Sequence, residues 1–394
     1  MENKLQRDKR SVTMHDVAQH AGVSRATVSR ILNNRDTPIS ISDATRHRVL
    51  EAVDELGYRP NRIAQSLMTN KTHIIGLSFP AFYAPSEPRD DWCDIPAYTI
   101  GRIISGVQSV TAKRHYDIQL LLRPEHDDSG PPHTNSPLDF VDGVIYVTPD
   151  PRYDLYTPIV EAGLPVVMLG PNPGNRPLTT VVGDNTGAIY ALTQALIRRG
   201  HRRIALLLPG DDTNLLSRLR KQGYMQALEE AGLPQEPDLI LPNDQSPFPH
   251  YLDQHQAGSV TQHILSLKPA PTAVLVGYSI LVYGVLRELR ASGVRCPDDL
   301  ELVSYGDELG FATSAPSVTA LDIRLAAQAA RAAEMLFEEI EGRCPAGRAI
   351  ICPPILRYRE SCPLNGAFTP PPTWGAFQAY QPARKEVVSA YEKQ

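Results

Sequence analysis

Hydrophobic positions near the N-terminus recur at helical spacing in three short segments. Each segment follows a residue that can cap a helix: Thr13, Ser24 and Ser42. Each also has an apolar stripe, formed by Val17 and Ala18, then by Val28, Ile31 and Leu32, then by Val49, Val53 and Leu56. Gly22 and Gly57 stand where the first and third segments would end, positions that often need left-handed backbone. The pattern predicts a compact set of short helices.

From residue 74 the pattern changes to short apolar runs separated by longer amphipathic stretches. The runs predict strands at 74–79, 118–122, 141–147, 166–169, 204–208, 273–276 and 300–305. The clearest amphipathic stretches are 188–199 and 217–231. Alternating strands and helices indicate right-handed βαβ units and parallel sheets covered on both faces. About 290 residues are more than a single hydrophobic core usually supports. We therefore expect an α/β domain of two doubly wound subdomains after the N-terminal all-α domain.

Charge is unevenly distributed between these two regions. The whole chain carries a formal net charge of −5. Residues 1–72 hold 12 Lys and Arg against 8 Asp and Glu, whereas the remainder holds 27 against 36. A basic module of +4 on an acidic body of −9 is compatible with a nucleic-acid contact confined to the N-terminal part.

Composition argues against several protein classes. The N-terminal residues are charged, with no apolar stretch after them, and the longest apolar window, 273–286, is shorter than the ~20 residues of a membrane span. The five cysteines are widely spaced and form no C-x-x-C pair, which favours reduced thiols over a disulfide or zinc framework. We therefore expect a cytoplasmic protein that does not enter a membrane.

The second predicted helix has the chemistry of a DNA-reading helix. A helix, a glycine-containing turn and a second helix form a helix-turn-helix, whose second helix enters the major groove. Its outward residues would be Arg25, Ala26, Thr27, Ser29 and Arg30. Arginine can pair with guanine, alanine can contact a thymine methyl group, and hydroxyls can bind phosphate. The alternative is a solvated helix face in a small all-α domain.

These residues lie within a longer resemblance. The stretches TMHDVAQHAGVSRATVSRILNN and ISDATRHRVLEAVDELGYRPNRIAQSLMTNKTHIIGLSFP resemble the lactose/galactose repressor (LacI) family of bacterial regulators. The resemblance resumes at GHRRIALL, PDDLELVSYGD, SVTALDI and RYRESC. It implies a flexible leader (1–12), a helix-turn-helix domain (13–58), a hinge helix and linker (59–72) and an effector-binding, dimerising domain (73–365). The proline-rich segment 366–394 has no periodicity, and we expect it to be a disordered tail.

The resemblance also implies roles in DNA binding. Arg25, Ala26 and Arg30 match base-reading positions. Residues that match phosphate contacts are Thr13, Ser24, Thr27 and Asn33, and Ser29, Tyr58 and Asn61 complete the predicted DNA-contacting set. Leu67, in the hinge helix, matches a leucine wedged into the minor groove, where an apolar side chain unstacks a base step and bends the duplex.

In the second module the resemblance implies a ligand cleft and a homodimer, possibly a higher oligomer. Open α/β sheets bind ligands beyond the carboxyl ends of their strands, here after residues 79, 122, 208, 276 and 305. The predicted effector-binding residues are Arg220, Tyr278, Ser279 and Asp307. Gly170 and Gly306 occupy positions where relatives place acidic side chains. With fewer carboxylate acceptors and an added aromatic face, we expect a larger, flatter or anionic effector rather than a plain hexose.

No constellation predicts catalysis, a metal or a cofactor. His126, Asp127, Asp128 and His133 could supply metal ligands, but the neighbouring Gly130, Pro131 and Pro132 indicate a solvated loop. No phosphate-binding loop, nucleophile elbow or dinucleotide fingerprint occurs. We therefore expect an effector-controlled repressor that binds operator DNA and is not an enzyme. A regulator without a small-molecule effector and a pure small-molecule binding protein remain the alternatives.

Overall fold

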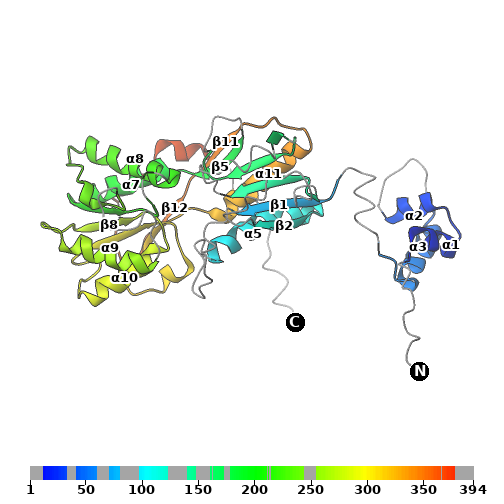
Figure 1. The fold of residues 1–394 in the computed structure, drawn as a ribbon, viewed down its shortest axis with the longest axis horizontal. Helices are drawn as coiled ribbons and strands as arrows, with labels where there is room; N and C mark the ends of the chain where they lie inside the picture. Colours follow the sequence, from blue (N-terminus) through cyan, green and yellow to red (C-terminus); the bar gives the residue numbers. More distant parts are fainter. Residues whose placement is uncertain are drawn as a thin grey trace, which may run out of the picture. The chain divides into compact units, whose positions relative to one another are not determined.

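The chain divides into two compact units, residues 1–72 and 73–394 (Figure 1). This computed structural model describes residues 12–32, 41–59, 71–79, 97–122, 140–147, 160–161, 163–172, 178–210, 212, 214–243, 254–364 and 366–377. The predicted leader up to residue 11 and most of the predicted hinge, 60–70, therefore lie outside the described residues.

The smaller unit contains the three expected helices, α1 (Met14–Ala21), α2 (Arg25–Leu32) and α3 (Asp43–Glu55). Thr13 caps α1 in a capping box with Asp16, and Ser42 caps α3 through the amide of Thr45. Gly22 ends α1 with a φ of 65°, a left-handed conformation that glycine adopts without steric cost. The core between the helices is formed by Val17, Ala18, Ala21, Val28, Ile31, Val49, Ala52 and Tyr58.

The first sheet of the larger unit has six parallel strands in the order β11-β5-β4-β3-β1-β2. Their bounds are Ile74–Phe79 (β1), Asp117–Leu122 (β2), Gly143–Val147 (β3), Val166–Leu169 (β4), Thr179–Gly183 (β5) and Ala349–Cys352 (β11). Helices α5 (Ala97–Thr111) and α11 (Leu325–Ile340) share one apolar core with this sheet. Together they form the first lobe.

The second sheet has the order β12-β10-β9-β8-β6-β7 and is parallel except for antiparallel β12. Its strands are Ile204–Leu207 (β6), Ile240–Leu241 (β7), Ala273–Val276 (β8), Glu301–Tyr305 (β9), Thr319–Asp322 (β10) and Ile355–Arg357 (β12). Helices α7 (Asn185–Arg198) and α8 (Leu215–Glu230) share one core with it. Helices α9 (Gln254–Ser266) and α10 (Leu281–Ala291) share another, which completes the second lobe.

The prediction of two doubly wound sheets is confirmed, and Figure 1 shows them as two lobes of the larger unit. The pattern missed β5, β7, β10, β11 and β12. β7 has only two residues, β11 and β12 are edge strands with exposed positions, and β5 and β10 are interrupted by polar residues such as Thr179, Thr180 and Thr319, so none of them has a continuous apolar run. The chain crosses between the sheets after β5, after β10 and after β11.

The prediction of a disordered tail from residue 366 is wrong for residues 366–377. This segment contains a short 3-10 helix, Pro372–Phe377, and Trp374 is only 7% exposed. Its indole joins the core that α7 and α8 share with the second sheet. Two aromatic side chains, Phe368 and Trp374, supply enough apolar surface to fix a segment that otherwise lacks periodicity.

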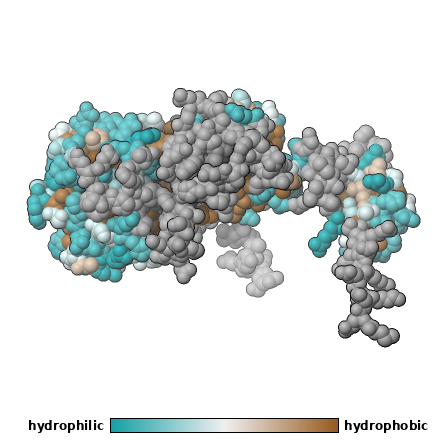
Figure 2. Space-filling model, in the orientation of Figure 1, coloured by the Kyte–Doolittle hydropathy of each residue, from teal (hydrophilic) through white to brown (hydrophobic). Residues whose placement is uncertain are grey.

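Over α8, α9 and α10 the visible face of the protein is mainly hydrophilic (Figure 2). Among the described residues, no helix is both long and apolar enough to cross a membrane.

Candidate functional site

The first candidate site is the outward face of α2. Ser24 precedes this helix, and its hydroxyl accepts a hydrogen bond from the amide of Thr27 at 3.1 Å. Val28 and Ile31 are buried in the core of the smaller unit, whereas Arg25 and Ala26 are exposed. Ser29 and Arg30 are half-buried. A rigid, capped helix thus presents a guanidinium group and a methyl group to solvent.

The other predicted DNA-contacting residues differ in exposure, and some lie outside the described residues. Thr13 is exposed, and its hydroxyl donates to the Asp16 carboxylate at 2.7 Å, so it already serves the cap of α1. Thr27 is half-buried and shares a hydrogen bond with Ser24. Tyr58 is only 9% exposed and packs in the core of the smaller unit. Asn33, Asn61 and Leu67 lie outside the described residues.

The second candidate site is a cavity of about 200 Å³ in the larger unit. For comparison, a cavity of about 150 Å³ holds benzene. Its walls come from the carboxyl ends of both sheets, including Val147, Leu169 and Gly183 of the first sheet and Pro209, Tyr278 and Asp322 of the second. The predicted positions after residues 208, 276 and 305 do line it, whereas the segments directly after residues 79 and 122 lie outside the described part.

Arg220 forms the polar wall of this cavity. Its side chain is buried, its Nε donates to Asn185 Oδ1 at 3.0 Å, and one terminal nitrogen donates to the carbonyl of Gly277 at 2.6 Å. The guanidinium carbon lies 4.5 Å from the ring centroid of Tyr305, a cation–π contact. The partners come from the turn after β5 and the loop after β8. Arg220 is therefore held in one orientation before any ligand arrives.

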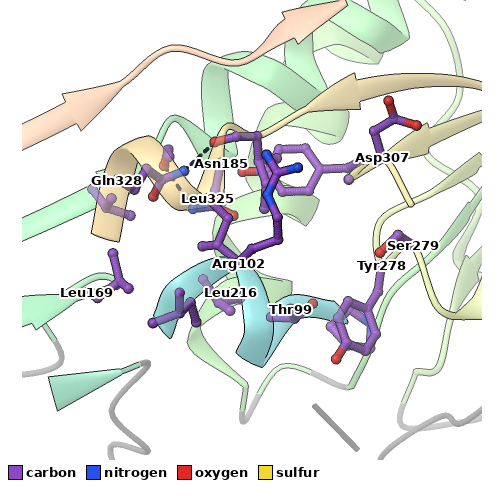
Figure 3. A pocket seen from close by; sticks show the side chains of 18 of the residues that line it. Thr99, Arg102, Leu169, Asn185, Leu216, Tyr278, Ser279, Asp307, Leu325 and Gln328 are labelled. Atoms are coloured by element: carbon purple, nitrogen blue, oxygen red, sulfur yellow. Dashed lines mark hydrogen bonds between the residues drawn. The ribbon is translucent and has the colours of Figure 1, made fainter. Parts of the chain in front are cut away.

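The loops after the adjacent strands β8 and β9 place a second polar pair at the cavity. Ser279 donates its hydroxyl proton to Glu308 Oε1 at 2.6 Å, and both residues are buried. Burial raises the pKa of the Glu308 carboxyl, although the hydrogen bond from Ser279 opposes that shift. Tyr278 is half-buried beside them, where Figure 3 shows its ring next to Ser279. This corner can offer a carboxyl group and an aromatic face.

The backbone conformations at Gly170 and Gly306 explain why these two positions, where we expected relatives to have acidic side chains, are glycine. Gly306 has a φ of 101°, and a Cβ atom there would lie 3.0 Å from the Ser279 side chain. Gly170 has a φ of 144°. Both also line the cavity. Because such backbone conformations disfavour any side chain, an acid at either position would need a rearranged loop.

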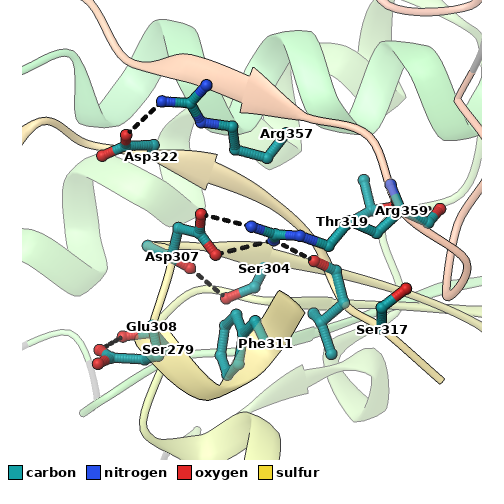
Figure 4. A network of polar contacts seen from close by, with 12 residues as sticks. Ser279, Ser304, Asp307, Glu308, Phe311, Ser317, Thr319, Asp322, Arg357 and Arg359 are labelled. Atoms are coloured by element: carbon teal, nitrogen blue, oxygen red, sulfur yellow. Dashed lines mark hydrogen bonds and ion pairs between the residues drawn. The ribbon is translucent and has the colours of Figure 1, made fainter. Parts of the chain in front are cut away.

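Two other acidic residues of the cavity wall, Asp307 and Asp322, form ion pairs with arginines (Figure 4). Asp307 accepts two hydrogen bonds from Arg359, both at 2.8 Å, and Figure 3 shows its carboxylate at the edge of the site. Asp322 accepts a hydrogen bond from Arg357 at 3.0 Å. A bidentate arginine–carboxylate pair is strong and geometrically defined. Asp307 was predicted to bind the effector, and in the structure its carboxylate holds Arg359.

Besides Asp307 and Asp322, the charged residues that line the cavity in the described part of the chain are Arg102, Arg220 and Glu308. Arg102, on α5, lines the cavity from the first lobe and donates to the hydroxyl of Tyr98 at 3.0 Å. Figure 3 labels Arg102, and Arg220 lines the same cavity from the second lobe. Because Asp307 and Asp322 are paired with Arg359 and Arg357, the two guanidinium groups of Arg102 and Arg220 face the single carboxyl group of Glu308 in the described wall.

Sequence reasoning missed several polar residues of the wall, among them Arg102, Asn185, Glu308 and Asp322. Glu308 adds a carboxyl group to the wall in the loop after β9, which the sequence analysis did not consider. Glu308 directly follows Asp307 in the chain, so the loop after β9 could have been searched for it. Asn185 had no such signal, since its role depends on the packing of α7 against α8. The metal candidates His126 to Asp128 and His133 lie outside the described residues.

Known proteins resemble this chain in sequence and in structure. Residues 13–61 match the family model "Bacterial regulatory proteins, lacI family", and residues 193–362 match "Periplasmic binding protein-like domain". The chain is 31% identical over 364 residues to the HTH-type transcriptional regulator CelR of Thermobifida fusca, covering 90% of this chain and 99% of CelR.

Solved structures give the same result. The transcriptional regulator CelR–cellobiose complex matches with a TM-score of 0.63 and 28% identity over 89% of this chain and 99% of that chain. The lac repressor dimer bound to operator and the anti-inducer ONPF matches with a TM-score of 0.73 and 22% identity, over the same shares. At that identity the second likeness concerns the fold.

Proposed function

Because the chain belongs to the lacI family of bacterial regulatory proteins, we propose that it represses transcription by binding a pseudo-palindromic operator as a homodimer. A small molecule in the cavity of the larger unit controls this binding. The observation that carries the proposal is the combination of an exposed, capped α2 in one unit with a buried, pre-oriented Arg220 in the other. Such a regulator acts on chromosomal DNA, which places it in the cytoplasm.

On DNA, α2 lies in the major groove with Arg25, Ala26 and Arg30 at base edges. Arg25 has the length and the exposure to pair with a guanine, and Ala26 presents its methyl group beside it. Thr13, Ser24, Thr27 and Asn33 contact the phosphate backbone. Asn61 and Leu67 belong to a hinge helix that inserts the leucine into the minor groove and bends the operator. Ser29 belongs to the proposed DNA contacts as well, whereas Tyr58, only 9% exposed, packs in the core of the smaller unit and is no longer proposed as one.

The effector combines an anionic or acceptor-rich group with an apolar body. Arg220 and Arg102 supply positive charge, while Asp307 and Asp322 are neutralised by their arginine partners. The apolar body lies against Tyr278, Leu169 and Leu325. Pre-oriented guanidinium groups bind carboxylates or phosphates without a further ordering cost.

A neutral sugar is the second candidate, and Glu308 favours it. Its carboxyl group and the Ser279 hydroxyl offer acceptors and a donor for sugar hydroxyls. The regulator CelR has been solved with cellobiose. The two candidates differ in which residue dominates binding: Arg102 and Arg220 for an acid, Glu308 for a sugar.

Operator selection from a random DNA pool tests the first part of the proposal. We expect the selected sequences to share a pseudo-palindrome, with affinity that falls as salt rises. Sequences without two-fold symmetry, or binding without sequence preference, would contradict it.

Calorimetry with matched ligands tests the effector. Cellobiose, glucose, glucuronate and phenyl phosphate separate neutral from anionic chemistry, and each ligand is then added to the operator complex. We expect the anionic members to bind more tightly and to change operator affinity. Preferential binding of cellobiose would show that the effector is a sugar. If no member of a broad ligand panel bound, the protein would be a regulator without a small-molecule effector.

A further inference from the structure

A C-terminal segment, residues 366–377, lies against α7 beyond the region that matches the family model, which ends at residue 362. Its 3-10 helix is drawn in orange-red beside α7 in Figure 1. Arg198, in the last turn of α7, donates to the carbonyl of Ala367 at 2.7 Å. Trp374 contacts Asp184, the residue that caps the start of α7. We call this segment the strap.

The strap follows α7 over its full length. Fourteen residues of helix extend about 21 Å. The strap is therefore bonded to both ends of α7, to Arg198 in its last turn and to Asp184 at its N-cap.

Trp374 is fixed by packing and by one hydrogen bond. Its side chain is buried among the residues of α7 and α8, and the ring of Phe368 lies 6.1 Å from it between centroids. The indole Nε1 donates to Asp184 Oδ2 at 2.8 Å. An indole has a single donor, which finds a partner when it is buried. Here that partner is a carboxylate.

Asp184 uses its two oxygens for different purposes. Oδ1 accepts from the amide of Gly187 at 2.8 Å and caps α7, while Oδ2 accepts from Trp374. A Cβ atom at position 187 would lie 2.3 Å from Oδ2. The absence of a side chain at Gly187 thus allows the carboxylate to fold over the first turn and present its second oxygen to the indole.

Both neighbours of Asp184 belong to the wall of the cavity. Gly183 ends β5, and Asn185 begins α7 at the first crossing between the lobes. Asn185 Oδ1 accepts from Arg220 Nε at 3.0 Å, and its amide nitrogen donates to the carbonyl of Gly183. A continuous series of hydrogen bonds and adjacent residues therefore runs from Trp374 through Asp184 and Asn185 to Arg220.

We propose that Trp374 is a positioning residue for the effector cavity, which it orients by holding Asp184 and, through Asn185, the guanidinium group of Arg220. The strap supplies a second layer of contacts behind the ligand-facing layer, and such contacts set how precisely a binding site is pre-oriented. This inference rests on the proposed effector cavity and adds a specific control of its geometry by the C-terminal segment.

Two ligand-free measurements on the full-length protein test this role with Trp374→Phe, which keeps an aromatic ring and removes the indole donor. Hydrogen exchange of peptides covering 184–190 should quicken about tenfold, because a charge-assisted hydrogen bond that supports the cap is lost. Peptides from β1 and β4 in the first lobe should not change. The NMR signal of the Arg220 Nε–H group, assigned by its loss in Arg220→Lys, should shift and exchange faster with water.

Tyr224→Phe is the matched control. It also removes one buried donor from an aromatic residue in the same core, since the Tyr224 hydroxyl donates to the carbonyl of Ile204 at 2.6 Å. This change should leave exchange at 184–190 unaltered. An equal rise in both variants, a uniform rise over both lobes, or an unshifted Arg220 signal in Trp374→Phe would overturn the proposal.

Asp184→Asn tests the same contact from its other side. Asparagine still caps a helix well, but its amide group cannot both cap Gly187 and accept from the indole. We expect Asp184→Asn to reproduce the Arg220 shift, and the double variant to add nothing to either single change. Additive effects would show that the two residues act separately. Neither measurement uses DNA or an effector, so its failure is distinguishable from a failure of the proposed function.

Discussion

The outward face of α2 and the cavity of the larger unit hold their functional side chains in opposite ways. On α2, Arg25 and Ala26 are adjacent in sequence and exposed, and the helix is anchored by Val28 and Ile31 on its other face. In the cavity, Arg220 is buried and held by groups from two other segments of the chain. A DNA contact can therefore change without loss of the fold, whereas an effector contact is also part of the packing.

Arg220→Ala should give the largest difference between the two regions. It leaves Asn185 Oδ1 and the Gly277 carbonyl without their donor and opens a void, which together should cost about 3 kcal/mol of unfolding free energy. Differential scanning calorimetry should show this loss in the transition of the larger unit. Any effector response should disappear, while operator affinity without effector stays nearly unchanged.

Arg218→Ala is the control on the same helix. Arg218 is exposed, and its replacement should change stability by less than about 0.5 kcal/mol. If both variants were equally stable, Arg220 would not be part of the packing. If Arg220→Ala kept its full response to the effector, Arg220 would not be an effector-binding residue.

Arg25→Ala and Arg30→Ala should each cost about 1–3 kcal/mol of binding free energy on the selected operator and little on random DNA. Their melting temperatures should match that of the unaltered protein, because neither side chain anchors the core of the smaller unit. Fluorescence anisotropy on both kinds of DNA provides the measurement. Arg46→Ala, an equal change of charge on exposed α3, serves as the control. Equal losses of binding free energy on operator and random DNA would show that Arg25 and Arg30 contact only the phosphate backbone.

The same contrast explains how far sequence reasoning could go. The helices of the smaller unit follow from local rules, because caps such as Thr13 and turns such as Gly22 act within a few residues. The two sheets follow from apolar runs. The cavity depends on contacts between segments far apart in the chain, such as Arg220 with Asn185 or Arg359 with Asp307. No periodicity encodes such contacts.

Ser24→Ala should give a smaller effect that joins stability and DNA binding in one residue. Ser24 caps α2 and is also a proposed phosphate contact, so it departs from the general behaviour of the exposed face. Loss of the cap should cost about 1 kcal/mol of unfolding free energy. Chemical denaturation of the smaller unit and operator titration should both register the change.

Ser24→Asp separates the two roles. Aspartate caps helices as well as serine does, but its charge would repel a phosphate. Stability should therefore be retained while operator affinity falls. Unchanged affinity in this variant would place the phosphate backbone away from Ser24.

Glu308→Gln should give the smallest effect, and one that depends on pH. Burial raises the pKa of Glu308 in the folded protein, so the unfolded chain loses this proton first as pH rises. The resulting loss of stability begins near the ordinary carboxyl pKa and is complete above the raised folded value. Glutamine cannot ionise and still accepts from the Ser279 hydroxyl. The variant should thus melt at a higher temperature than the unaltered protein at pH 8. This advantage should disappear at pH values below the ordinary pKa of a glutamate side chain.

Glu360→Gln is the opposite control, because hydrogen bonds from the backbone and side chain of Ser317 lower the pKa of Glu360. The ionised Glu360 carboxylate therefore stabilises the fold at pH values above the ordinary glutamate pKa, and its replacement should lower the melting temperature there. Equal pH profiles for the two variants would show that burial at the cavity does not govern Glu308.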